Sequence, residues 1–198
     1  MGRQEGIDHL LRAVHHIVFS LQRRDIQFGL VGGGTSLEQM KSLAADLGVA
    51  EFVTFTGRVP DRELLAMLNT ADVCVNPDVA NEMNDKSTMN KVMEYMALGK
   101  PIVQFDLTEG RFSAQRASLY ARKNDAVDFA KKIVELLDDP AQRAAMGAFG
   151  RRRVEEQLEW RHEAPRLLAA YDALWRGSAR RRVRGGACAR LGSRESSP

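Results

Sequence analysis

Short apolar segments alternate with amphipathic helical segments along most of this chain of 198 residues. Runs rich in Val, Ile, Leu and Phe, each of a length typical of a strand, lie at residues 26–31, 52–56, 72–77, 101–105 and 118–121. They show little alternation of apolar and polar residues, so both of their faces are expected to be buried. Such an order predicts an α/β fold, a doubly wound parallel sheet with helices on both faces.

Helical spacing of apolar residues fills most of the sequence around these runs. The predicted helices cover residues 7–21, 35–48, 60–69, 88–98, 125–138, 140–157 and 161–175. The pattern begins with a helix, whereas a doubly wound domain normally begins with a strand. We therefore expect the sheet to lack its first strand and the domain to be truncated at its start.

Basic residues are concentrated at the carboxyl end of the chain. The formal net charge is +3, but residues 177–198 contain six arginines and one glutamate, so this tail carries +5 and residues 1–176 carry −2. A basic segment with few apolar residues predicts a disordered tail beside one folded domain at residues 1–176. A solvated tail is the favoured interpretation; weak contact with an anionic membrane surface stays open, and no nucleic-acid partner is expected.

No targeting or membrane segment is visible in the sequence. No apolar run approaches the roughly 20 residues that span a bilayer, and the first residues show no basic-then-apolar leader. Cys74 and Cys188 lie far apart, which argues against a disulfide or a metal framework. We expect a cytoplasmic protein without a metal or other cofactor.

The segment with the most specific chemistry is residues 81–106, "NEMNDKSTMNKVMEYMALGKPIVQFD". Thr88, Lys91 and Glu94 are spaced by three residues, so they lie on one stripe of a helix that Ser87 or Thr88 is expected to cap. The helix start and the Lys91 ammonium would attract an anion, and Glu94 would accept hydrogen bonds from a vicinal diol. An alternative is that Lys91 and Glu94 form an ordinary surface ion pair.

The run "STMNKVMEYMALGKPIV" resembles the donor-binding segment of the retaining glycosyltransferases of family four, which have the GT-B fold. Four further segments resemble the same family in the same order. They are "GIDHLLRA", "FGLVGGG", "VTFTGRVPDRELLAMLNTADVCVNP" and "DDPAQRAAMGAFGRRRVEE". The resemblance covers about residues 3–175 and implies the carboxyl-terminal, nucleotide-sugar-binding half of such an enzyme.

The resemblance assigns roles to individual positions of this sequence. Glu94 matches the glutamate that holds the nucleotide ribose, and Lys91 matches a lysine near the diphosphate. Arg58 matches a position beside the base and phosphates, although an exposed turn residue is an equal alternative there. Thr88 and Met89 would offer backbone amides, and Gly33 would allow a close approach of the ligand.

The sequence departs from the family pattern at three places. Lys86 stands where many members have an acidic residue that contacts the donor sugar, and Asn84, Asp85 or Glu82 is a candidate substitute. Glu5 stands where many members have a phosphate-contacting lysine. The amino-terminal domain is absent.

The resemblance implies transfer of a sugar, with retention, from a nucleotide diphosphate to an acceptor that the sequence does not identify. The catalytic residues are unknown, and this chain is expected to be inactive without the missing domain. The alternatives are a non-catalytic nucleotide-diphosphate-binding module and a nucleic-acid-binding protein driven by the tail.

Overall fold

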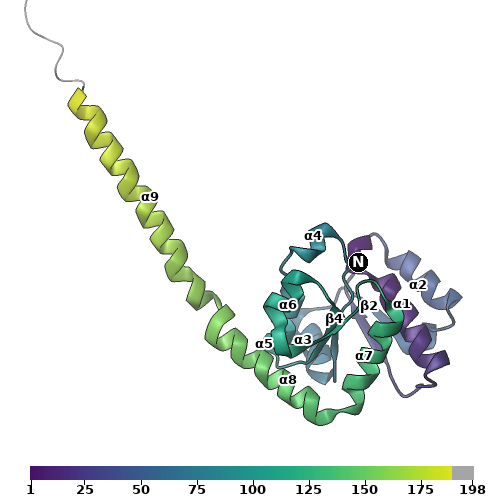
Figure 1. Cartoon of the computed structure of the whole chain (residues 1–198). Helices are drawn as coiled ribbons and strands as arrows, with labels where there is room; N and C mark the ends of the chain where they lie inside the picture. The colour runs from purple at the N-terminus through teal and green to yellow at the C-terminus, as the bar shows by residue number, and fades with distance from the viewer. Residues whose placement is uncertain (189–198) are drawn as a thin grey trace, which may run out of the picture. The chain divides into compact units, whose positions relative to one another are not determined.

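The computed structural model describes residues 1–188, with side chains described to residue 176 (Figure 1). It divides the chain into a compact unit, Met1–Glu155, and a second unit that starts at Glu156. The first unit contains all the strands of the described residues, and the second contains the helix α9 (Trp160–Cys188).

The strands of the first unit are parallel and form two separate sheets. The strands are β1 (Phe28–Val31), β2 (Val53–Gly57), β3 (Cys74–Asn76), β4 (Ile102–Phe105) and β5 (Ser118–Ala121). One sheet pairs β1 with β2, and the other has the order β3-β4-β5. This arrangement confirms the prediction of a parallel α/β fold, and each predicted strand is present.

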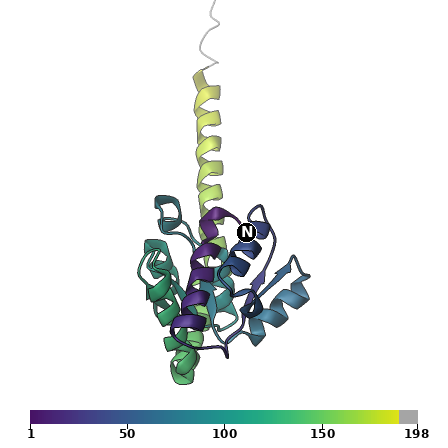
Figure 2. The ribbon, with the colours of Figure 1, turned by 90° about the vertical axis from the view of Figure 1, so that its right-hand side faces the viewer.

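Helices cover both faces of these sheets. The helices are α1 (Ile7–His15), α2 (Leu37–Asp46), α3 (Asp61–Thr70), α4 (Glu82–Asp85), α5 (Asn90–Ala97), α6 (Thr108–Ala114), α7 (Ala126–Asp138) and α8 (Pro140–Arg153). Helices α1 and α7 pack together and bury Leu10, Val14, Phe129 and Ile133 in the main core. Figure 2 shows α1 in purple, lying across the strands. Because successive residues of a strand face opposite ways, Phe28 joins this core while Gly29 faces Met67 of α3 on the other face.

Local sequence signals explain where the last helices of this unit start. The Asp125 carboxylate accepts hydrogen bonds from the amides of Val127 and Asp128, which caps α7. Asp139 accepts from the amide of Gln142, and Pro140 occupies the first turn of α8. Pro is favoured at that position because the first helical amides have no partner within the helix.

A gap separates β1 from β3. In a doubly wound sheet of order 3-2-1-4-5-6 the first strand lies in the middle, between the second and the fourth. The five strands β2, β1, β3, β4 and β5 follow that order with the central position empty. A cavity of about 1030 Å³ lies there, lined by β1, β3 and the helices α1, α3 and α5. The structure thus agrees with the expectation that the first strand is missing.

The carboxyl-terminal segment differs from its prediction. The sequence predicted a domain to residue 176 and a disordered tail from residue 177, whereas the compact unit ends at Glu155 and α9 continues to Cys188. Arginine and alanine, which recur in residues 177–188, are strong helix formers, so the basic composition is compatible with a helix. Residues 189–198 of the predicted tail lie outside the described residues.

Candidate functional site

Helix α5 begins beside the carboxyl end of β3, where ligands bind in open α/β sheets. Its N-cap residue is Met89, and no side chain caps its first turn. The prediction that Ser87 or Thr88 caps this helix is therefore wrong. The Ser87 hydroxyl donates to the carbonyl of Met83 (2.6 Å), and the Thr88 hydroxyl donates to the carboxylate of Glu109 (2.7 Å).

Lys91 forms an ion pair in the first turn of α5. Its ammonium donates to the Oδ1 atom of Asp78 at 2.7 Å, and the Asp78 side chain is 3% exposed. Burial raises the pKa of Asp78, Lys91 opposes this rise, and the carboxylate of Glu5 adds to it. A lysine ammonium has three donors, so this contact fixes the side chain and leaves donors for a second partner.

Asp78 belongs to a set of buried polar groups behind Lys91. The Asn76 amide donates to Oε1 of Gln104 (3.5 Å), and the Gln104 amide donates to the carbonyl of Gly110 (3.4 Å). Within the described part of the chain, Oδ1 of Asn76 and Oδ2 of Asp78 are buried without a hydrogen-bond partner. Two acceptors without donors therefore lie just behind the helix start.

Glu94 lies one turn beyond Lys91 and is exposed. Among the described residues its carboxylate takes part in no hydrogen bond or ion pair. The alternative of a surface ion pair between Lys91 and Glu94 is therefore wrong for this structure, because Lys91 pairs with Asp78. Lys91 and Glu94 line the cavity between β1 and β3, together with Met1 and Glu5.

The glycine-rich turn after β1 contacts the start of the chain. The Met1 ammonium donates to the carbonyl of Gly33, and the Met1 carbonyl accepts from the amide of Ser36 (3.1 Å). A Cβ atom on Gly33 would meet nothing within 4 Å, whereas one on Gly34 would lie 2.1 Å from the Met1 nitrogen. The chain itself approaches closely at Gly34, and the close approach of a ligand at Gly33 stays a prediction.

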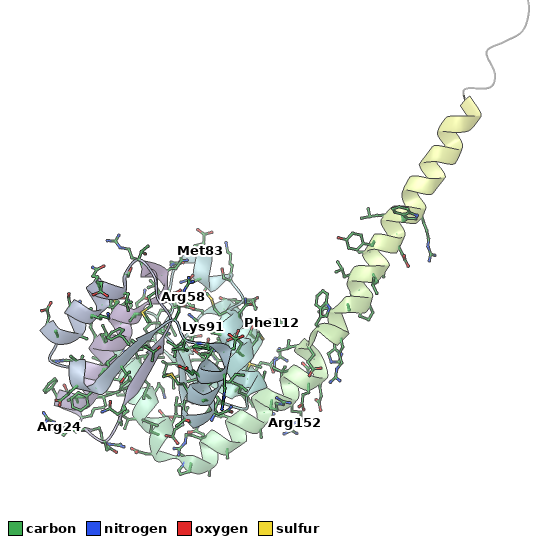
Figure 3. All side chains as sticks on the ribbon, turned by 180° about the vertical axis from the view of Figure 1, so that it is seen from behind. Arg24, Arg58, Met83, Lys91, Phe112 and Arg152 are labelled. Atoms are coloured by element: carbon green, nitrogen blue, oxygen red, sulfur yellow. The ribbon has the colours of Figure 1, made fainter. Side chains whose placement is uncertain are left out.

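Arg58 follows Gly57 at the carboxyl end of β2 and is exposed. It does not line the cavity that Lys91 and Glu94 line. Arg58 and Lys91 are labelled in Figure 3. Among the described residues no hydrogen bond or ion pair involves its guanidinium. Arg58 is thus available to a ligand, and its assignment beside the base and phosphates stays a prediction.

Asn84 and Asp85 hold the loop that precedes α5. Asn84 is buried, and its amide donates to the carbonyls of Gln4 (3.0 Å) and Val79 (2.9 Å). Asp85 accepts from the amide and hydroxyl of Thr108 and from Lys123, which lowers its pKa to about 2. These contacts are structural, so a donor-sugar contact by Asn84 would have to replace them.

The sequence matches the family model "Glycosyl transferases group 1" over residues 1–139. The chain belongs to this family. It is 34% identical over 175 residues to the GDP-mannose-dependent alpha-(1-6)-phosphatidylinositol monomannoside mannosyltransferase of Mycolicibacterium smegmatis, covering 83% of this chain and 44% of the relative. It is 27% identical over 177 residues to the 2-deoxystreptamine glucosyltransferase of Streptomyces kanamyceticus, covering 87% and 43%.

A solved structure supports the same fold for this member of the family. The sucrose-phosphate synthase of Thermosynechococcus elongatus superposes with a TM-score of 0.76 at 25% identity, over 89% of this chain and 44% of that chain. The Rossmann-like half-domain of a GT-B glycosyltransferase is thus the fold of this chain. The chain spans less than half the length of the curated relatives it matches.

The described residues of this chain contain no group of three or more His, Cys, Asp or Glu that could hold a metal ion. Cys74 is buried, and burial raises the pKa of its thiol to about 12, so it is an unreactive packing residue. Within the described part of the chain, no helix is long and apolar enough to cross a membrane.

Asp78 is the site residue that sequence reasoning missed. The available signal was its place, two residues after a strand, in a sheet whose ligands lie beyond the carboxyl ends of strands. The sequence could not show that the carboxylate turns inward and meets Lys91, 13 residues away.

Proposed function

We propose that this chain is the donor-binding domain of a retaining glycosyltransferase that uses a nucleoside diphosphate sugar. The observation that supports this proposal most is the placement of Lys91 and Glu94, one turn apart on α5, with the Lys91 ammonium held by the buried Asp78 that follows β3. A nucleotide would bind beside the carboxyl end of such a strand in this class of sheet.

The diphosphate would lie at the start of α5. Free amides and the positive end of the helix dipole attract an anion there, and the Met89 end of α5 has no side-chain cap. The ammonium of Lys91 adds hydrogen-bond donors, and Asp78 holds it in one orientation. A departing nucleoside diphosphate carries developing negative charge, which these groups would stabilise without a metal.

The ribose would lie one turn further along α5. The Glu94 carboxylate is unpaired in the described structure and exposed, so it can accept two hydrogen bonds from the ribose hydroxyls. The name of the mycolicibacterial relative contains a GDP-mannose donor, which agrees with a nucleotide sugar as the substrate class. The base, the sugar and the acceptor are left open, as is a role for Gly33, Arg58, Asn84, Ser87 and Thr88.

Calorimetric titration with GDP and with UDP tests the proposed donor site. Replacing Glu94 with alanine removes hydrogen bonds to a charged group, which are worth about 1.5–3 kcal/mol, so affinity should fall roughly tenfold or more. Glu135→Ala is the matched control, because Glu135 is a surface glutamate on α7 that pairs with Lys132 instead. Equal affinity of wild type and Glu94→Ala would refute the role of Glu94. Addition of EDTA should leave the affinity unchanged.

A non-catalytic nucleotide-binding domain is the second candidate, because the chain spans only 44% of the first relative. Both candidates predict nucleotide binding, so an assay of sugar release from GDP-mannose and UDP-glucose distinguishes them. We expect this chain alone to bind nucleotide weakly and to transfer no sugar to added acceptors. Transfer by this chain alone would place the acceptor site within its 198 residues.

A further inference from the structure

From the contacts at the start of α6 we infer that Glu109 binds hydroxyl groups of the sugar in the donor. The inference rests on the proposed function and extends it, because it assigns a partner to the part of a nucleotide sugar that Lys91 and Glu94 do not bind. Glu109 lies in the first turn of α6, which follows the carboxyl end of β4. Ligands of open α/β sheets bind beyond these strand ends.

The Glu109 carboxylate is held against the amino end of α5. Its Oε1 atom accepts hydrogen bonds from the hydroxyls of Thr88 (2.7 Å) and Ser113 (2.9 Å). Thr88 directly precedes the N-cap of α5 and Ser113 is buried, so two elements fix the carboxylate. Its Oε2 atom takes part in no hydrogen bond among the described residues. A carboxylate has about four acceptor sites, so Glu109 can accept further hydroxyl donors.

Glu109 also differs from most acidic residues of this region in having no basic partner. Residues 72–109 contain seven acidic side chains, and five of them pair with lysine or arginine, namely Asp72, Asp78, Glu82, Asp85 and Asp106. The other two, Glu94 and Glu109, form no ion pair among the described residues. Glu109 is only partly exposed, so hydrogen bonds from ligand hydroxyls would offset the cost of removing its charge from water.

The order of these groups along α5 matches the order of the parts of a nucleotide sugar. Glu109 lies beside Thr88, before the helix; Lys91 is in the first turn, and Glu94 is one turn further. A diphosphate at the helix start is repelled by either carboxylate, so the uncharged ribose and the uncharged sugar are the parts that fit beside the two acids. With the ribose at Glu94, the sugar on the other side of the diphosphate lies at Glu109.

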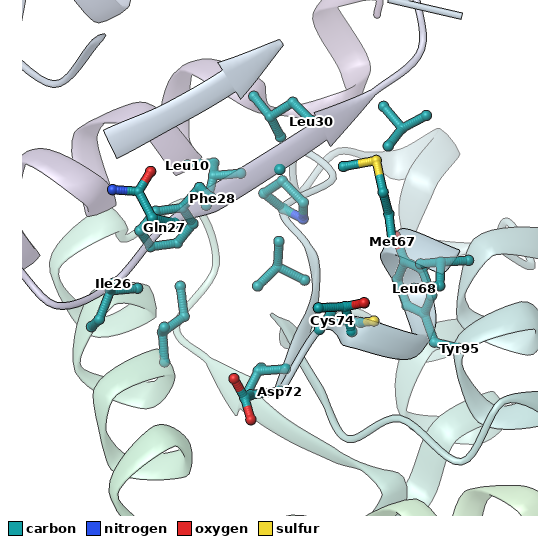
Figure 4. Close-up of a pocket in the computed structure, with 18 of the residues that line it drawn as sticks. Leu10, Ile26, Gln27, Phe28, Leu30, Met67, Leu68, Asp72, Cys74 and Tyr95 are labelled. Atoms are coloured by element: carbon teal, nitrogen blue, oxygen red, sulfur yellow. The ribbon is translucent and has the colours of Figure 1, made fainter. Parts of the chain in front are cut away.

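The cavity between β1 and β3 does not suit the sugar. Figure 4 shows large apolar and aromatic side chains along this cavity, among them Leu10, Phe28, Met67, Leu68 and Tyr95. Such side chains offer few hydrogen-bond partners, and burying hydroxyl groups without partners is unfavourable. The hydroxyls of Thr88 and Ser113 and the carboxylate of Glu109 form a polar surface on the α6 side of the helix start instead.

Ligand-detected NMR titration of the full chain tests the inference with two ligand pairs, GDP with GDP-mannose and UDP with UDP-glucose. Glu109→Gln keeps an oxygen for Thr88 and Ser113 and removes the charge that strengthens hydrogen bonds from the sugar. The Kd of the nucleotide sugar should rise about fivefold or more. The Kd of the nucleotide alone should stay the same or fall, because a negative charge near the diphosphate is removed. Saturation transfer to the sugar protons should fall relative to the ribose protons.

Two further variants separate binding of the sugar from a structural role. Glu135→Gln is the matched control, because Glu135 lies on α7 and pairs with Lys132, and it should change neither Kd. Glu109→Ala should raise the Kd of the nucleotide sugar roughly tenfold or more. A purely structural role of Glu109 predicts equal factors for the nucleotide and the nucleotide sugar.

Equal factors, or an unchanged Kd of the nucleotide sugar for both Glu109 variants, would overturn the inference while the proposed nucleotide site stands. If the wild type binds neither nucleotide, the proposed function is refuted, and the inference that rests on it is refuted as well.

Discussion

Replacing Lys91 with methionine should destabilise the protein much more at pH 7 than at pH 4. The substitution leaves the carboxylate of Asp78, 3% exposed, without its charged partner. Removing one member of a buried pair costs about 3–5 kcal/mol. Because Lys91 is 31% exposed and Asp78 can take up a proton, we expect the lower end, about 3 kcal/mol, or roughly 6–12 °C in thermal midpoint.

The direction of the pH dependence follows from the raised pKa of Asp78. A carboxyl group whose pKa is raised in the folded state, above its ordinary value of 3.8, stabilises the folded state when the pH is below 3.8. This stabilisation is lost as the pH rises through the folded-state pKa. At pH 7 the charged Asp78 is therefore unfavourable, and Lys91 offsets this cost. Without Lys91 the cost is larger, and protonation at low pH removes it.

Chemical denaturation at pH 7 and pH 4 measures these effects. Asp78→Asn should lower the free energy of unfolding by about 1 kcal/mol or less, because the remaining Lys91 ammonium reaches water. The double variant Asp78→Asn with Lys91→Met should be little less stable than Asp78→Asn alone. Lys86→Met is the control, because Lys86 pairs with Glu82 at 2.8 Å with both side chains exposed, and an exposed pair contributes about 0–1 kcal/mol. Equal losses for Lys91→Met at both pH values, or for Lys91→Met and Lys86→Met, would refute the reasoning.

Three further predictions concern the packing and the termini of the structure. Gly147→Ala should lower the thermal midpoint although alanine favours helices, because the new Cβ atom would lie 2.1 Å from the carbonyl of Gly99. Gly150→Ala should lower it less, because the nearest neighbour of its Cβ atom would lie 3.1 Å away. A larger loss for Gly150→Ala than for Gly147→Ala would contradict this packing. The pKa of Asp85 is about 2 in the folded state, against an ordinary value of 3.8, so the ionised carboxylate stabilises the folded state. This stabilisation is lost as the pH falls from about 4 to 2. Acid denaturation of the wild type should therefore be steeper over this pH range than that of Asp85→Asn. Deleting residues 177–198 should shift the thermal midpoint by no more than about 2 °C, since this segment has few apolar residues to bury. A larger drop would show that the segment contributes to the stability of the fold.

Regular patterns made most of the fold predictable from the sequence. The run at residues 118–121 becomes β5 with the same bounds, and the Asp139–Pro140 signal marks the start of α8. Strong periodicity and cap residues carry such information because they are local. The short helices α4 and α6 were not predicted, since segments of four and seven residues have too few apolar positions for a period.

The candidate site was less predictable because its contacts are not local. The sequence placed Lys91 and Glu94 on one stripe of one helix, and the structure keeps both at the cavity. It could not predict that Asn84 would be used to hold the carbonyls of Gln4 and Val79, because Gln4 lies 80 positions away. Polar residues in a loop look alike in a sequence, and only the fold decides which of them turn inward.

The contact between Gln104 and Gly110 should restrict which pairs of residues occur at these two positions in related sequences. A Cβ atom at position 110 would lie 2.7 Å from Oε1 of Gln104, whose amide is held between Asn76 and the Gly110 carbonyl. A larger residue at 110 is therefore compatible with the fold only after the side chain at 104 becomes shorter or turns away. Among related sequences these two positions should substitute together, with glutamine at 104 accompanied by glycine at 110, although they lie six positions apart along the chain.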